Sequence, residues 1–208
     1  MFFKLNSISV KDSLDGFSLI EVMISLAIIT IITTIVMIRY GSFNSAVLLK
    51  NQAFDMALTI REVQADAVST RGDLTASANN FREGYGVYFD LSDSNQSYII
   101  FLDKNDSGST GRYDSGDLVL QTVNLDPRFK INSLLALRAS AGSKVAENVS
   151  AVFKRPSYNA KTVAQWRPGS VLLNLSNVIG FEVELVSTDG PAITRTVIVN
   201  AAGLIEVR

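Results

Sequence analysis

Residues 16–23 read GFSLIEVM and open an apolar run that continues to Ile38. Between Phe17 and Ile38 the only ionisable side chain is that of Glu21. A helix rises about 1.5 Å per residue, so this run would be roughly 33 Å long, enough to cross a bilayer core of about 30 Å. The sequence therefore predicts a transmembrane helix over residues 17–38 that carries one carboxylate near its start.

The carboxylate of Glu21 needs a physical reason, because an acid inside a membrane helix is costly. A central acid costs about 2.5–3.5 kcal/mol to insert, and less toward the interface. In a plain single-pass anchor, the side chain would extend to the lipid headgroups. The other interpretation gives Glu21 a partner of opposite charge on another chain, which makes a carboxylate tolerable inside a protein-lined bundle.

The junction before Glu21 resembles a prepilin signal. Residues 1–16 (MFFKLNSISVKDSLDG) end in Gly, and the apolar core that follows is about twice as long as that of an ordinary secretory signal. Gly, an aromatic residue, a hydroxyl residue and then Leu-Ile-Glu closely resemble the signal of type IV pilins and type II secretion pseudopilins. The resemblance implies a leader over residues 1–16, a cut after Gly16, N-methylation of Phe17, and neutralisation of a neighbouring subunit's N-terminal amine by Glu21.

The same resemblance implies a location and a set of partners. A prepilin peptidase would cut the chain on the cytoplasmic side of the cytoplasmic (inner) membrane. The single-pass subunit would stay in contact with lipid, with its soluble domain outside the cytoplasm. An inner-membrane assembly platform would then move it into a helical fibre of pilin or pseudopilin subunits. The absence of Cys and of a proline in the helix favours a minor subunit.

Helical patterning resumes beyond the membrane run, from Phe43 to about Thr70. One helix over residues 17–71 is the simplest prediction, with Gly72 as its stop signal. The alternative is two helices with a hinge at residues 41–42. The face expected to pack on the soluble domain carries Val47, Phe54, Leu58 and Ala65, with Ala57, Arg61 and Val68 beside it.

From residue 72 to residue 208 the apolar pattern changes to a period of two, which is typical of strands. The segments 85–90 and 96–102 form a hairpin signal, and residues 118–123 and 129–131 follow as strands. Further strands are expected at 145–153, 170–175, 178–187, 193–200 and 203–208. Strands after a helix, without helical alternation, predict an α+β fold in which the long N-terminal helix packs on antiparallel β-sheet. The resemblance to pilins implies that this is a pilin fold.

The strand order also resembles the GspH and FimT group of minor pilins and pseudopilins. The segments that carry this resemblance are the hairpin at 86–103, the turn at 103–108 and the closing strand pair at 195–203. It does not extend to residues 130–165. Within this group, the resemblance adds an alternative function as a DNA-binding minor pilin of a DNA-uptake pilus.

Residues 103–114 match the pattern of a calcium-binding loop. Oxygen ligands fall at positions one, three, five and twelve, Asp103, Asn105, Ser107 and Asp114, with Gly108 at the sharp turn. Calcium is the one cofactor that the sequence suggests. The same residue types are common in turns that hold no metal, so a metal-free turn is the alternative.

Charge is segregated along the soluble domain. Residues 82–126 hold three cations against eight acids, a net charge of −5, and residues 127–168 hold eight cations against one acid, a net charge of +7. Lys154, Arg155 and Arg167 lie close in sequence to aromatic rings, a pattern compatible with nucleic-acid contact. The alternatives are a solvated loop or a contact between the acidic and basic faces of two subunits.

The chain contains no His and no Cys, and no nucleophile motif is recognisable. A membrane-anchored enzyme is therefore disfavoured. The sequence predicts a structural subunit of a type IV pilus or a type II secretion pseudopilus.

Overall fold

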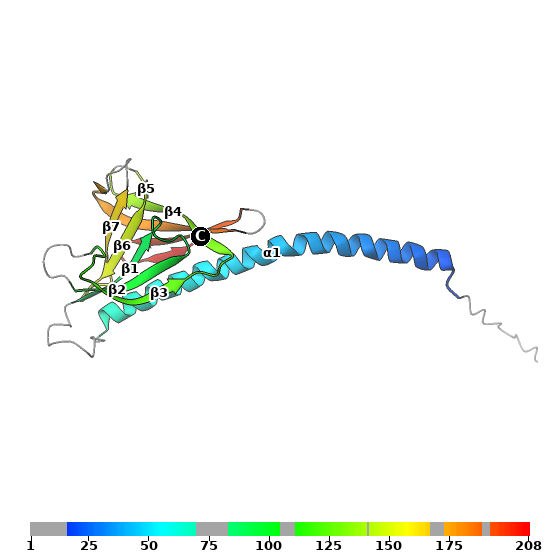
Figure 1. Ribbon diagram of the computed structural model, residues 1–208, viewed down its shortest axis with the longest axis horizontal. Helices are drawn as coiled ribbons and strands as arrows, with labels where there is room; N and C mark the ends of the chain where they lie inside the picture. Colours follow the sequence, from blue (N-terminus) through cyan, green and yellow to red (C-terminus); the bar gives the residue numbers. More distant parts are fainter. Residues whose placement is uncertain (1–15, 70–82, 105–110, 141, 167–172, 189–191) are drawn as a thin grey trace, which may run out of the picture. The chain divides into compact units, whose positions relative to one another are not determined.

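A computed structural model describes residues 16–69, 83–104, 111–140, 142–166, 173–188 and 192–208 (Figure 1). For residues 38–43 it describes the backbone only. The chain divides into two compact units, Met1–Gly41 and Ser42–Arg208. Each unit is considered by itself.

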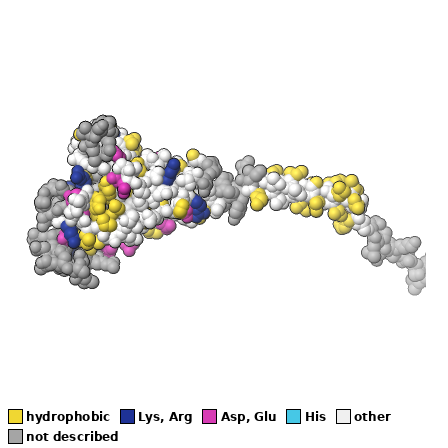
Figure 2. Space-filling view, in the orientation of Figure 1, with side chains coloured by type: hydrophobic (Ala, Val, Ile, Leu, Met, Phe, Trp, Pro, Cys, Tyr) yellow, Lys and Arg dark blue, Asp and Glu magenta, His cyan; other side chains and the backbone are white. Residues whose placement is uncertain are grey.

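The helix α1 (Leu19–Val68) is continuous in its backbone through Gly41 and Ser42, so there is one helix rather than two. The stop expected at residues 71–72 lies outside the described residues. The stretch Leu19–Met37 of α1 is long and apolar enough to span a membrane, with a mean hydropathy of 2.5. Figure 2 shows hydrophobic side chains at the surface of this segment, and every side chain in it is exposed.

Four hydroxyl groups in this apolar stretch are satisfied inside the helix. Each donates to the carbonyl oxygen four residues earlier at 2.7–2.8 Å, and they belong to Ser25, Thr30, Thr33 and Thr34. A hydroxyl bonded in this way needs no partner from outside. The polar atoms of these residues therefore do not prevent the segment from lying in hydrocarbon.

The second unit contains two antiparallel sheets, which confirms the α+β prediction. The first has the order β3-β2-β1-β6-β7-β8 and consists of β1 (Gly84–Asp90), β2 (Ser97–Asp103), β3 (Leu118–Asn124), β6 (Asn148–Phe153), β7 (Ala160–Trp166) and β8 (Leu173–Asn174). The second has the order β11-β10-β9-β4-β5 and consists of β4 (Phe129–Arg138), β5 (Lys144–Ala146), β9 (Val178–Ser187), β10 (Thr194–Asn200) and β11 (Ile205–Val207).

The structure differs from the predicted strands at three places in the middle of the domain. The strand expected at 129–131 is the ten-residue β4, whose apolar alternation breaks at a bulge where Asn132 and Ser133 both donate to the Glu184 carboxylate on β9. The expected strand 145–153 is two strands in different sheets, because the chain changes sheet at Glu147. Strand β7 was not predicted at all.

The buried face of α1 is not the one that the sequence predicted. Val47, Phe54 and Leu58 are 41, 44 and 57% exposed. The face that packs in the core lies on the opposite side of the helix and consists of Leu49, Ala53, Met56, Ala57, Ile60, Val63 and Ala67. Three of these seven residues are alanines, which let the helix approach closely, whereas the prediction followed the largest side chains.

Polar contacts fix this half of α1 on the sheets. The Gln64 amide donates to the carbonyl oxygens of Tyr158 (2.9 Å) and Gly203 (3.0 Å), and the Arg61 guanidinium donates to that of Ile205 (2.9 Å). Gly203 has a φ of 80°, and a Cβ there would overlap the Tyr158 carbonyl oxygen. The helix is therefore tied to the turns β6–β7 and β10–β11, which belong to different sheets.

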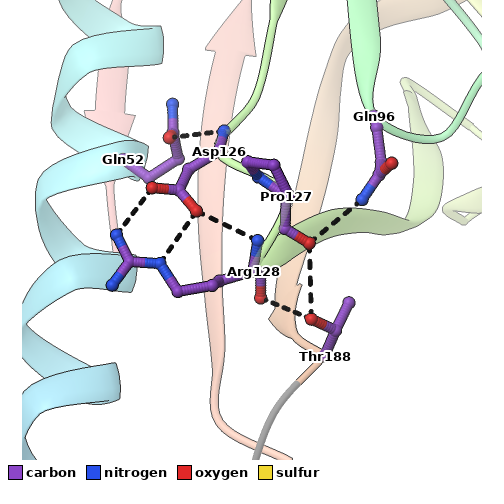
Figure 3. Close-up of polar contacts among 6 residues, drawn as sticks. All are labelled: Gln52, Gln96, Asp126, Pro127, Arg128 and Thr188. Carbon is purple, nitrogen blue, oxygen red and sulfur yellow. Dashed lines mark hydrogen bonds and ion pairs between the residues drawn. The ribbon is translucent and has the colours of Figure 1, made fainter.

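The chain crosses from the first sheet to the second at residues 125–128 (Figure 3). The Asp126 carboxylate accepts from the Arg128 backbone N–H (3.0 Å) and Nε (2.9 Å), and forms an ion pair with its terminal nitrogen at 2.6 Å. The Asp126 N–H donates to the side-chain oxygen of Gln52 on α1 at 3.2 Å. The crossing is thus held from one side by the helix.

On the other side, the crossing is hydrogen-bonded to two residues that lie next to strands, one beside each sheet. The Pro127 carbonyl oxygen accepts from the Gln96 amide at 3.2 Å, next to the start of β2. The Arg128 carbonyl oxygen accepts from the Thr188 N–H (2.8 Å) and hydroxyl (2.9 Å), next to the end of β9. This short segment is therefore hydrogen-bonded to the helix and to residues beside a strand of each sheet.

We expect the Asp126 contact to appear in the acid stability of the protein. Hydrogen bonds from Arg128 lower the pKa of Asp126 to about 2. Because the pKa is lower in the folded state, the stabilisation is present above the ordinary pKa of about 3.9 and is lost as the pH falls toward 2. Asp126→Asn should remove this part of the acid dependence, measured as urea midpoints between about pH 5 and 2.

The control is Asp93→Asn, at an exposed carboxylate in the β1–β2 turn. It should leave the acid slope of the wild type in place. Equal slopes for the wild type and Asp126→Asn would contradict the role given to this ion pair.

Candidate functional site

The predicted calcium loop starts at a buried carboxylate. Asp103 is the last residue of β2 and is 6% exposed, and its carboxylate accepts from the Gly111 N–H at 3.0 Å. The second half of the loop is anchored on the first sheet, because the Tyr113 ring packs between the rings of Tyr88 and Phe101 at 4.8 and 5.1 Å. Asn105 and Ser107 lie outside the described residues.

A third carboxylate, that of Asp117, joins the two ends of the loop. One of its oxygens accepts from the Lys104 N–H (3.1 Å) and the other from the Asp114 N–H (2.8 Å). Burial raises the pKa of Asp117, and repulsion from Asp114 and Asp103 adds to the rise. The carboxylates are thus near enough to repel one another, and both Asp103 and Asp117 accept hydrogen bonds from backbone N–H groups.

In the described part of the chain, no group of three or more His, Cys, Asp or Glu side chains is arranged to hold a metal ion. Two of the four predicted ligands, Asn105 and Ser107, fall outside that part. The arrangement of Asp103, Asp114 and Asp117 suits a turn that closes through carboxylates. A cation among them would also relieve their repulsion, so calcium binding stays a prediction.

The basic segment is spread over both sheets. Lys130 and Arg138 lie on β4, and Lys144 on β5 places its ammonium group 3.3 Å from the centre of the Trp166 ring. One face of that ring is therefore already covered by a cation. Lys161 lies on β7 of the first sheet, so the described cations of this segment are distributed over strands of both sheets.

Two of the three residues predicted to contact nucleic acid lie in one described turn. Lys154 and Arg155 follow β6 in the turn to β7, whereas Arg167 lies outside the described residues, directly after Trp166 at the end of β7. In the β6–β7 register, Phe153 faces Ala160 and Asn148 faces Gln165. The turn and the end of β7 are thus separated by about 17 Å along the strands. Nucleic-acid binding by these three residues remains a prediction.

The predicted processing and assembly residues lie together at the start of α1. Gly16 and Phe17 are exposed, and the Ser18 carbonyl oxygen accepts the first helical hydrogen bonds from the N–H groups of Glu21 (3.0 Å) and Val22 (3.2 Å). Glu21 therefore lies in the first helical turn, where the positive end of the helix dipole favours a carboxylate.

Comparison with known proteins identifies this N-terminal segment. The family model for the prokaryotic N-terminal methylation motif matches residues 15–37. No curated protein and no solved structure matches the chain. The chain therefore carries a type IV pilin-like prepilin signal, which implies processing by prepilin peptidase and assembly with other pilin subunits. The motif indicates a structural subunit rather than an enzyme, and with the apolar helix it fits membrane anchoring.

Calcium binding can be tested through the melting temperature. If Asp103 and Asp114 bind the ion, millimolar calcium should raise the melting temperature of the wild type, because a ligand that binds only the folded state stabilises it. Asp114→Asn should abolish most of the shift, and the control Asp93→Asn should keep it. An equal shift with magnesium, or no shift with calcium, would contradict a calcium loop.

Proposed function

We propose that this protein is a minor structural subunit of a type IV pilus or a type II secretion pseudopilus. It is held in the cytoplasmic membrane by α1, with the sheet domain outside the cytoplasm. Prepilin peptidase removes residues 1–16, Phe17 is N-methylated, and the subunit enters the fibre through its helix. The observation that carries this proposal is the match of the N-terminal methylation motif to residues 15–37.

The exposure of the helix supports this proposal. All side chains from Gly16 to Met37 are exposed within the single chain, so lipid must cover them before assembly and other helices afterwards. In the fibre, Glu21 neutralises the N-terminal amine of a neighbouring Phe17. The acid that is unfavourable in a plain anchor then has a partner of opposite charge.

A second exposed stripe supports assembly through the outer half of α1. Val47, Phe54 and Leu58 recur at intervals of seven and four residues, so they lie on one side of the helix, opposite the face that packs in the core. The sheet domain does not cover this stripe. Contact with the helices of neighbouring subunits would remove it from water, which gives the exposed stripe a role in the fibre.

The alternative is a DNA-binding minor pilin of a DNA-uptake pilus. The observation in its favour is the β6–β7 turn, where Lys154 and the ring of Tyr158 are both exposed. Processing and assembly through α1 would be the same in both cases.

We expect assembly and processing to separate in two variants. Glu21→Ala and Leu58→Glu should each be cut after Gly16 as in the wild type. Incorporation of each variant into sheared fibres should nevertheless fall about tenfold or more. Glu21→Ala removes the charge partner, and Leu58→Glu places an unpaired charge in a helix contact. The measurement is the ratio of subunit in fibres to subunit in membranes.

The matched control is Val145→Glu, which adds the same charge at an exposed apolar residue on β5, away from the helix. It should assemble normally. If Leu58→Glu is incorporated as well as the wild type, the exposed stripe of Val47, Phe54 and Leu58 has no role in assembly. If Glu21→Ala is incorporated as well as the wild type, the charge pairing of Glu21 is contradicted.

A further inference from the structure

A hollow of about 330 Å³ lies between the end of β2 and the turn that joins β6 to β7. We propose that it is a binding pocket for an oxyanion of the phosphate class. Its volume is at the lower end of the range of about 300–1,000 Å³ that is usual for small-ligand sites. Val152 and Ala160 form its apolar wall, Gly111 contributes bare backbone, and the remaining described lining residues are polar or charged.

Two lysine side chains bring positive charge to the walls of the hollow. Lys161 lies on β7 directly opposite Val152 on β6, and Lys154 follows the last residue of β6. Both lysines line the hollow, and Asp103 is the one carboxylate among the described lining residues. Lysine is a compact cation with three donors that point in different directions, which suits the several oxygens of a phosphate better than the two of a carboxylate.

The Asp103 carboxylate is fixed in place at the edge of the hollow, where its charge reduces that of the two lysines. This carboxylate is almost fully buried and accepts the Gly111 N–H. Gly111 has a φ of 103°, and a Cβ there would lie 2.7 Å from Cδ of Lys161. The stem of Lys161 therefore runs over the bare glycine backbone. A side chain that is ordered before binding loses less entropy when it binds a ligand.

Neutral donors complete the rim of the hollow. Ser157 and Asn159 both line it, and their turn is held by the Asn159 N–H donating to the Ser157 hydroxyl (3.0 Å) and the Ser157 N–H donating to the Lys154 carbonyl oxygen (3.3 Å). Tyr158, between them, is not among the lining residues. Among its described lining residues, the hollow thus has charge and hydrogen-bond donors but no aromatic ring, so it fits a phosphate group rather than a base.

The phosphate group has two sources that share this chemistry: a free ion or small phosphorylated molecule, or a phosphodiester of a nucleic-acid strand. The pocket is formed within the sheet domain and does not depend on fibre assembly. A protein that does not bind phosphate could therefore still be a fibre subunit, and a protein that does not assemble could still bind phosphate.

The test is a titration of the full chain with inorganic phosphate in a maltoside detergent, which contains no phosphorus. Binding is monitored through the NMR chemical shifts of the backbone amides of residues 157–161. Inorganic phosphate should bind saturably, and acetate at matched ionic strength should not. Lys154→Gln and Lys161→Gln should each weaken phosphate binding roughly fivefold to tenfold, as expected for one charge near the anion. The control Lys130→Gln removes a cation on β4 in the other sheet and should have no effect.

Asp103→Asn gives an effect of opposite sign. The amide keeps an oxygen for the Gly111 N–H and removes the opposing charge, so phosphate should bind more tightly. A single-stranded oligonucleotide that competes with phosphate and loses affinity in Lys154→Gln would identify the phosphodiester as the source, and phosphate binding without such competition would identify the free ion. Absence of saturable phosphate binding, or equal losses in Lys130→Gln and Lys154→Gln, would overturn the proposal.

Discussion

The apolar surface of Leu19–Met37 must leave water, and no described part of the chain covers it. Fully burying one Val, Leu or Ile side chain contributes about 1.5–3 kcal/mol, so a segment of this length strongly favours any apolar environment. Lipid supplies that environment before assembly, and neighbouring helices supply it afterwards. Glu21 is the one charged residue in the segment. If its carboxylate meets a positive charge among the neighbouring helices, that environment is more favourable for the segment than lipid.

The outer half of α1 satisfies two demands at once. Its core face uses alanines so that the helix lies close to the sheets, and Gln64 and Arg61 tie it to turns of both. Its opposite face keeps Phe54 and Leu58 exposed. One element therefore joins the sheet domain to a surface that is suited to other subunits. The crossing at Asp126 and Arg128, bonded to Gln52, keeps both sheets in place beside it.

The elements that the sequence predicted correctly have strong local signals. The apolar run to Ile38, the β1–β2 hairpin and the last three strands follow simple periodicity. The failures have a common physical cause, because they depend on contacts between distant residues. Which apolar side of α1 is buried depends on the position of the sheets. Strand β4 continues past Asn132 because it pairs with β9 on both sides of the bulge, and at the bulge Glu184 accepts a hydrogen bond from Asn132.

The same distinction holds for the candidate sites. Gly16, Phe17 and Glu21 were predicted from a local motif, and the motif match covers all three. The grouping of Lys154 with Arg167 came from sequence proximity, whereas β7 separates the turn at Lys154 from Trp166. Among the described residues, Lys161 and Asp103 line the same hollow as Lys154. A sequence pattern could not bring these three together while β7 was unassigned.

The central claim, that the N-terminal stretch is a processed prepilin signal, is tested most directly by the intact mass of the mature protein. The protein should be purified from membranes of a cell that contains prepilin peptidase, beside a Gly16→Leu variant. We predict a chain that begins at Phe17 and carries one methyl group, and a Gly16→Leu chain that keeps its leader. A wild-type mass that retains residues 1–16, or that corresponds to a cut after the apolar run, would contradict the account.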